Sequence, residues 1–127
     1  MLEKITHRNE QAEYYTEERC HINELSNSAA DAAVSIAEAR VDPGVSTRWH
    51  RLHNMVERYV ILSGQGLAEI GNLPAERVGP GAVVLIPAEC RQRITNTGRE
   101  DLVFLAICTP RFRQNCYEDM EDEQTPH

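Results

Sequence analysis

Two imidazoles and a carboxylate lie close together in the middle of the chain, at His50, His53 and Glu57. A two-histidine, one-carboxylate set is the ligand type associated with non-haem Fe(II), and it is compatible with Zn, Mn or Ni. Residues two apart on a strand share a face, so His53 faces away from His50 unless a bulge or the following turn rotates it inward. Both arrangements stay open, and His53 is therefore a conditional metal ligand.

Two further side chains near these residues could contact a substrate. If His50 points into the protein interior, Arg48 and Leu52 share its face, and Tyr59 shares the face of Glu57. The fork of a guanidinium group can hold a carboxylate or a phosphate. Arg48 and Tyr59 are therefore candidate substrate contacts, and their alternative roles are an ion pair and a packed ring.

Short strands separated by turn residues must position these side chains. Asp42-Pro43-Gly44 and Ser63-Gly64-Gln65-Gly66 carry strong turn chemistry, whereas no helical pattern of useful length is present. The expected strands are residues 19–25, 33–41, 47–52, 57–63, 67–70, 76–78, 82–86, 91–95 and 102–108. Many short strands with regular turn signals predict an all-β sandwich or barrel.

Two spaced motifs resemble those of the cupin superfamily. The first cupin motif reads G, five residues, H-x-H, three or four residues, E, six residues, G, and Gly44, His50, Glu57 and Gly64 fall at those intervals. Leu52 occupies the place of the second histidine.

The second cupin motif reads G, five residues, P-x-G, two residues, H, three residues, N. Gly81, Pro87 and Asn96 follow its spacing. Glu89 stands where the glycine is expected, and Gln92 stands where the last metal-binding histidine is expected.

The resemblance covers roughly residues 33–108 and implies an all-β fold with a single double-stranded β-helix, the cupin or jelly-roll barrel. We expect one cupin domain over residues 1–127, with an N-terminal arm at 1–18 and an acidic C-terminal tail at 111–127. The resemblance further implies that His50, Glu57 and Gln92 line the barrel. Any divalent metal ion (Fe, Mn, Ni or Zn) would depend on His50 and Glu57 first, with Gln92 adding an amide oxygen.

Cupins include dioxygenases, sugar isomerases and epimerases, decarboxylases, sugar-binding regulators and storage proteins, so the fold is a poor guide to activity. The resemblance implies a protein that binds a small molecule. It further implies a metal-assisted enzyme of isomerase, epimerase or dioxygenase type, which acts on a small anionic or hydroxylated substrate. The alternative is a non-catalytic binding or sensing protein. In that case Leu52 and Gln92 mark a site without metal, and His50 and Glu57 form a hydrogen-bonded pair.

Composition excludes several other classes of function. A net charge of −7 and a pI of about 5.2 argue against nucleic acid or an anionic membrane as the main partner. No segment approaches the roughly 20 apolar residues of a membrane span, and the polar start lacks a signal-peptide core. We therefore expect a cytoplasmic protein with a small-molecule ligand. Its four cysteines form no C-x-x-C pair and are expected to be free thiols.

One apolar run predicts an interface between subunits. In Tyr59-Val60-Ile61-Leu62 the outward half is apolar as well as the inward half. An apolar outer strand face needs a cover, and many cupins are similar in forming dimers. We therefore expect a homodimer.

Overall fold

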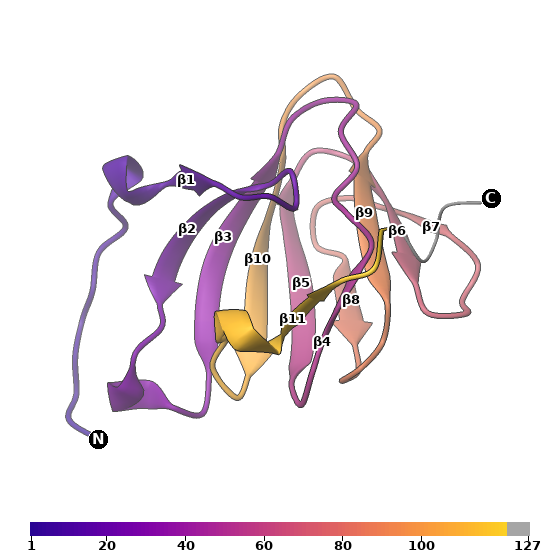
Figure 1. Ribbon diagram of the computed structural model, residues 1–127. Coiled ribbons are helices and arrows are strands. Elements are labelled where there is room, and N and C mark those ends of the chain that lie inside the picture. Colours follow the sequence, from indigo (N-terminus) through magenta and orange to yellow (C-terminus); the bar gives the residue numbers. More distant parts are fainter. Residues whose placement is uncertain (122–127) are drawn as a thin grey trace.

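The computed structural model describes residues 1–121, and its strands form two antiparallel sheets that face each other (Figure 1). One sheet has the order β1-β2-β3-β10-β5-β8, and the other has the order β11-β4-β9-β6-β7. The strands are β1 (Tyr14–Tyr15), β2 (His21–Ser26), β3 (Ser35–Val41), β4 (His50–Leu52), β5 (Val56–Ser63), β6 (Gly66–Ile70), β7 (Glu76–Val78), β8 (Val83–Ile86), β9 (Gln92–Asn96), β10 (Leu102–Thr109) and β11 (Tyr117–Asp119). Three short 3₁₀ helices accompany them, η1 (Glu10–Ala12), η2 (Ala29–Asp31) and η3 (Gln114–Cys116).

Side-chain alternation explains why these segments form a two-layered barrel. Along β5 and β9, every second residue is buried between the sheets, and the residues between them are less buried. The core meets at Tyr59 and Phe104, whose ring centroids lie 4.4 Å apart. Its largest fully buried apolar side chains are Phe104, Ile61, Ile86, Ile94, Leu102 and Val41. Burial of these chains supplies the main driving force for closing one sheet on the other.

The turn between β5 and β6 depends on a glycine. Gly64 has a φ of 87°, and a Cβ atom there would lie 2.5 Å from the carbonyl oxygen of Asp101. Only a residue without a side chain permits both the backbone conformation and this close approach. Gly64 therefore lets the β5–β6 hairpin pack against the turn that leads into β10.

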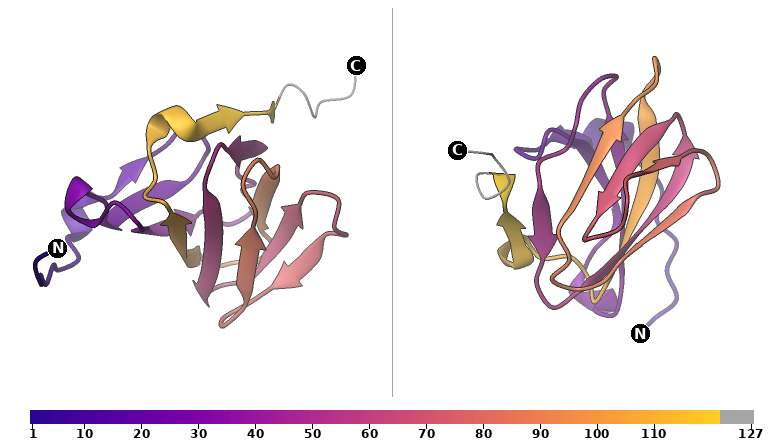
Figure 2. Two further views of the ribbon diagram at one scale, coloured as in Figure 1. Left: turned by 90° about the horizontal axis from the view of Figure 1, so that it is seen from below. Right: turned by 90° about the vertical axis from the view of Figure 1, so that its right-hand side faces the viewer.

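Nine of the strands correspond to the nine that the sequence predicts, with boundaries that differ by a few residues. The other two strands, β1 and β11, were not predicted. β1 pairs with β2, so part of the N-terminal arm is an added strand. β11 pairs with β4, with Tyr117 opposite Leu52 and Asp119 opposite His50. Figure 2 shows the η3–β11 segment running alongside β4.

The expected acidic tail therefore includes an ordered strand in its described part, whereas residues 122–127 of that tail lie outside the described residues. Within residues 1–121 no helix is long and apolar enough to cross a membrane. Cys20, Cys90, Cys108 and Cys116 are free thiols.

Candidate functional site

His50 presents a defined tautomer to the interior. The side chain is 3% exposed, and its Nδ1 atom lies 2.8 Å from the carbonyl oxygen of Arg48. A carbonyl oxygen can only accept, so Nδ1 carries the hydrogen and Nε2 of the neutral ring keeps its lone pair. Nε2 lies 3.7 Å from a carboxylate oxygen of Glu18, and the Tyr117 ring stacks on the imidazole with centroids 5.1 Å apart. His50 is therefore positioned to accept a proton at Nε2.

Glu57 is a buried carboxyl group with a free oxygen. Its Oε2 accepts a hydrogen bond from Sγ of Cys108 at 3.6 Å, whereas Oε1 has no partner. Burial raises the pKa of Glu57 above its usual value, and the Glu18 carboxylate adds to the shift. The neighbouring His50 opposes the shift, and Gln92 and Cys108 oppose it less. Glu57 therefore keeps its proton to a higher pH than an exposed glutamate.

Gln92 points its amide nitrogen into the interior. The Tyr59 hydroxyl donates to Oε1 of Gln92 at 2.5 Å, and this uses the amide oxygen. The Nε2 group of Gln92 is buried without a partner. Burial raises the pKa of Tyr59 well above its usual value, so the phenol stays protonated and continues to donate. The Tyr59 hydroxyl therefore fixes the orientation of the Gln92 amide group.

These side chains do not fit the divalent metal site that the sequence resemblance implies. Leu52, at the place of the second histidine, is a buried apolar residue that contributes no ligand. The amide oxygen of Gln92 already accepts a hydrogen bond from Tyr59, and its N–H groups cannot bind a metal ion. Within residues 1–121, no three His, Cys, Asp or Glu side chains are grouped so that they could hold a metal ion.

His53 does not turn inward and shares no site with His50. Its Nδ1 atom contacts Oε2 of Glu89, and its Nε2 atom lies 2.6 Å from Oε1 of Glu118. The turn that follows does not rotate the side chain, although Asn54 has a φ of 62°. The hydrogen bonds with Glu89 and then Glu118 raise the pKa of His53. His53 therefore connects two surface segments, and the inward option for this residue is wrong.

Arg48 does not share the inward face of His50 either. Its guanidinium group binds Asp119, with Nη2 3.0 Å from Oδ2. β4 begins only at His50, so the strict alternation of a strand does not extend back to residue 48. Tyr59 does lie in the interior, 6% exposed, next to Gln92.

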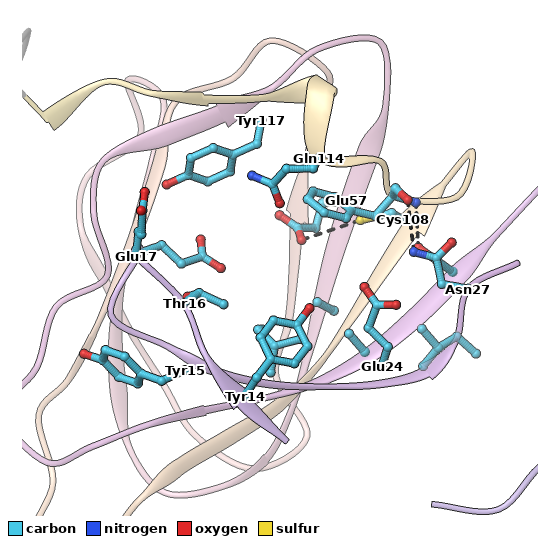
Figure 3. A pocket seen from close by; sticks show the side chains of 17 residues that line it. Tyr14, Tyr15, Thr16, Glu17, Glu24, Asn27, Glu57, Cys108, Gln114 and Tyr117 are labelled. Atoms are coloured by element: carbon cyan, nitrogen blue, oxygen red, sulfur yellow. Dashed lines mark hydrogen bonds between the residues drawn. The ribbon is translucent and has the colours of Figure 1, made fainter. Parts of the chain in front are cut away.

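A cavity of about 470 Å³ opens beside Glu57 (Figure 3). Its lining residues are Tyr14, Tyr15, Thr16, Glu17, Glu18, Ile22, Glu24, Asn27, Ser35, Ile36, Ala37, Glu57, Ala106, Cys108, Phe112, Gln114 and Tyr117. A smaller cavity of about 50 Å³ shares Glu18, Glu57 and Tyr117 with it and reaches His50 and Tyr59. The volume of the larger cavity suits a small-molecule ligand.

Several lining residues were missed in the sequence. Glu18 comes from the N-terminal arm, and Tyr117 comes from the segment expected to be a solvated tail. Neither lies in a motif or on a predicted strand, so only the folded arrangement of the chain identifies them. Cys108 ends the last predicted strand, and its contact with Glu57 depends on the pairing of β10 with β5.

Comparisons with known proteins agree with this architecture. No curated protein sequence matches the chain significantly. Among solved structures, KdgF from Halomonas sp. is 13% identical with a TM-score of 0.76, covering 90% of this chain and 98% of its own. Pac13, described as a nucleoside dehydratase, is 12% identical with a TM-score of 0.75, covering 98% of this chain and 100% of its own.

A protein from Thermotoga maritima described as a predicted oxalate decarboxylase is 23% identical with a TM-score of 0.75, covering 84% of this chain and 99% of its own. At these identities the likeness shows the fold alone, and a further similar structure is described as having a double-stranded β-helix domain. The all-β double-stranded β-helix is therefore confirmed. The family model described as Cupin domain matches residues 37–108, more than half of the chain. The chain belongs to the cupin family.

Proposed function

We propose that this protein is an enzyme that moves protons on a small hydroxylated substrate without the help of a metal ion. The observation that carries the proposal is that His50 and Glu57 both line the smaller cavity, which adjoins the larger one. His50 keeps a lone pair on Nε2, and the pKa of buried Glu57 is raised. Buried titratable groups with different environments beside a cavity are typical of acid and base pairs.

The two groups suit a carbonyl compound that carries a neighbouring hydroxyl group. Nε2 of His50 takes the proton from the carbon beside the carbonyl, and the electrons of that C–H bond form a C=C bond. The Glu57 carboxyl group gives its proton to the carbonyl oxygen, which yields an enediol. His50 completes an isomerisation by returning the proton to the former carbonyl carbon, while the Glu57 carboxylate takes the proton of the neighbouring hydroxyl group, whose oxygen becomes the new carbonyl oxygen.

Gln92 and Tyr59 orient the substrate in this scheme. Tyr59 lines the smaller cavity, and its hydroxyl holds the amide of Gln92, whose buried Nε2 group has no partner in the protein and is left for a substrate oxygen. Preorganised donors aimed at an oxygen that gains charge are among the largest contributions to catalysis. The name of Pac13 lends support, since a protein of the same fold is described as a dehydratase of a hydroxylated compound.

The second candidate is a binding or sensing protein that uses the same cavity without turnover. Unpartnered buried groups on Glu57 and Gln92 favour it equally, because a ligand that satisfies them binds whether or not it reacts. Metal-assisted catalysis is a third possibility, and metal content decides it.

The test is hydrogen exchange from carbon in D₂O. Small hydroxy aldehydes, hydroxy ketones and sugars are incubated with untagged protein, and deuterium incorporation at the carbon beside the carbonyl is followed by NMR. We expect exchange that persists after chelation and in protein shown by elemental analysis to be metal-free. His50→Gln and Glu57→Gln should lower its rate by at least about 100-fold, the contribution typical of a general acid or base.

The matched controls are His7→Gln and Glu76→Gln, since both residues are exposed and neither lines the cavity. They should exchange at the rate of the unmodified protein. Exchange that requires an added metal ion would overturn the metal-independent scheme. Tight ligand binding with no exchange would favour the sensing protein.

A further inference from the structure

We infer that the substrate carries an amino group that is positively charged at neutral pH, and that the cavity excludes anionic compounds. The inference rests on the proposed function and names the class of compound that the same site takes. The sequence-based expectation was a small anionic or hydroxylated substrate. The inference keeps the hydroxylated compounds and excludes the anionic ones.

The charges around the cavity all have one sign. Besides the buried carboxyl group of Glu57, three glutamates line it, Glu17, Glu18 and Glu24, and its lining contains no lysine, arginine or histidine. A cleft lined by one sign of charge concentrates ligands of the opposite sign and repels those of the same sign. A phosphate or carboxylate group would therefore meet repulsion with no cation to offset it.

Two arginines on bordering segments, Arg48 and Arg111, do not reverse this, and Arg113, which is exposed between Phe112 and Gln114, is not among the lining residues. Arg48 is held by Asp119 through its Nε and Nη2 atoms, each 3.0 Å from Oδ2. Arg111 donates from Nη1 to Oδ1 of Asn27 at 2.9 Å, and Asn27 rather than the guanidinium group lines the cavity. Neither arginine offers its guanidinium group to a ligand in this cavity.

The buried carboxyl group supplies an independent observation. Glu57 is 8% exposed, lines the cavity and has an unpartnered Oε1 atom. That atom needs a polar partner from the ligand, and a hydroxyl group satisfies it whether Glu57 is protonated or ionised, because a hydroxyl group both donates and accepts. Glu18 lines both cavities, and its carboxylate lies 3.7 Å from Nε2 of His50. An ammonium group beside Glu18 would leave the hydroxylated end of the same molecule at Glu57.

Aromatic rings in the cavity lining also favour a cation. Figure 3 shows Tyr14 and Tyr15 on one side of the cavity and Tyr117 on another, and Phe112 also lines it. The faces of such rings attract cations within about 6 Å of the ring centre. A neutral polyol would also form hydrogen bonds with the carboxylates. It would not gain the attraction of a cation to the aromatic rings or to the negative charges of the carboxylates. The amine is therefore the favoured member of the hydroxylated class.

Matched ligands test the inference directly. The first set is glucosamine, glucose and glucuronate, and the second is 2-amino-1,3-propanediol, glycerol and glycerate. Binding to the full-length protein is measured by ligand-observed NMR at pH 7 and at two salt concentrations. We expect the amine of at least one set to bind at least about tenfold more tightly than its acid, with an advantage that shrinks as salt screens it. An acid that binds as tightly as its amine, or failure of both amines to bind at millimolar concentration, would overturn the inference.

Charge-neutral variants supply the second readout. Glu18→Gln combined with Glu24→Gln should weaken amine binding about tenfold and leave binding of the neutral member nearly unchanged. Glu76→Gln combined with Glu100→Gln removes the same two charges at exposed positions outside the cavity lining and should change neither. Circular dichroism checks that each variant is folded, and an unaltered amine affinity in the folded double variant would also contradict the inference.

The outcomes separate this inference from the proposed function. If an acid binds and exchanges deuterium through His50 and Glu57, the charge preference is wrong and the proton-transfer function stands. If amines bind in preference but no hydroxylated carbonyl compound exchanges, the charge preference stands and the proton-transfer function fails.

Discussion

The carboxyl group of Glu57 lies where solvent cannot stabilise its charge, so its ionisation must destabilise the fold. Its pKa is raised in the native state, chiefly by burial, relative to an unfolded chain near 4.5. Between the two values the native state holds a proton that the unfolded state has lost, so stability falls as pH rises through this window. The stability that this retained proton contributes is fully present below the unfolded pKa. Above the folded pKa that contribution is lost, and stability no longer changes with pH on account of Glu57.

Glu57→Gln should abolish this contribution to pH dependence. We expect the variant to gain stability relative to the unmodified protein as pH rises above about 4.5, by about 1.4 kcal/mol for each unit of pKa shift. Urea unfolding of both proteins at pH 4 to 8 measures the difference between their free energies of unfolding. The contributions of the other titrating groups are the same in both proteins and cancel in this difference. A difference that does not change with pH would mean that Glu57 has the same pKa in both states.

Tyr59 donates the hydrogen bond that orients Gln92. Tyr59→Phe removes the hydroxyl and leaves the buried Oε1 atom of Gln92 without a donor, which costs about 1–3 kcal/mol of unfolding free energy. Urea unfolding at pH 7 provides the measurement. Tyr15→Phe is the matched control because Tyr15 is exposed, and it should stay within about 0.5 kcal/mol. Equal effects of the two changes would contradict the assigned role of Tyr59.

The cupin spacing placed much of the site in advance. It predicted that His50, Glu57 and Gln92 line the barrel, and strand alternation added Tyr59 to the face of Glu57; all four are buried. It could not show that Gln92 turns its nitrogen rather than its oxygen inward, because that orientation depends on the Tyr59 hydroxyl of another strand. The predicted ligand role of Gln92 was therefore the least secure part of the metal hypothesis.

At the scale of elements, β11 is attached to β4 by a cluster of charged side chains. Glu118 pairs with His53 and with Arg51, at 2.6 Å and 3.1 Å, and His53 also contacts Glu89. The same strand carries Tyr117, which lines the cavity and stacks on His50. The position of the cavity wall therefore depends in part on this surface cluster.

Raising the pH should loosen β11. The pKa of His53 is raised by its partners Glu89 and Glu118, so its contribution is fully present below the unfolded value near 6.5 and is lost as pH rises through the folded value. We expect the NMR signals of the Tyr117 ring to shift between pH 6 and pH 9. In His53→Gln the shift should be much smaller, and an identical shift in both proteins would place the cause elsewhere.

Two short edge strands, β1 and β11, were not readable from the sequence, although the short edge strand β7 was. β1 has two residues, both exposed, and β11 has three residues that include two acidic ones. Such segments lack a pattern of their own and become strands only because a partner edge is available, β2 for one and β4 for the other. Since both carry cavity residues, the mouth of the site could not be predicted.

At the scale of the whole molecule, the outer face of the six-stranded sheet carries an apolar patch over β8, β5 and β10. Strand register places Leu85 beside Arg58 and Val83 beside Val60, so side chains of β8, β5 and β10 gather on one face. The outward apolar residues are Val60, Leu62, Val83, Leu85, Val103, Leu105 and Ile107. Among them Leu62, Val83 and Leu85 are 45%, 64% and 61% exposed, far above the usual exposure of large apolar side chains in a core.

We propose that a second copy of this chain covers that face. β8 is an edge strand, so its unpaired backbone groups and its exposed Val83 and Leu85 can meet the same strand of a partner in an antiparallel, self-complementary contact.

Light scattering at micromolar concentration tests the proposed dimer and should give about twice the 14.4 kDa of one chain. Val83→Lys combined with Leu85→Lys should give the mass of one chain with an unchanged circular dichroism spectrum, because both side chains point away from the core. The matched control, Glu76→Lys with Arg77→Glu on the other exposed edge strand β7, should leave the doubled mass intact. A monomeric unmodified protein would contradict the proposal, and a dimer that survives the β8 changes would move the interface to another face.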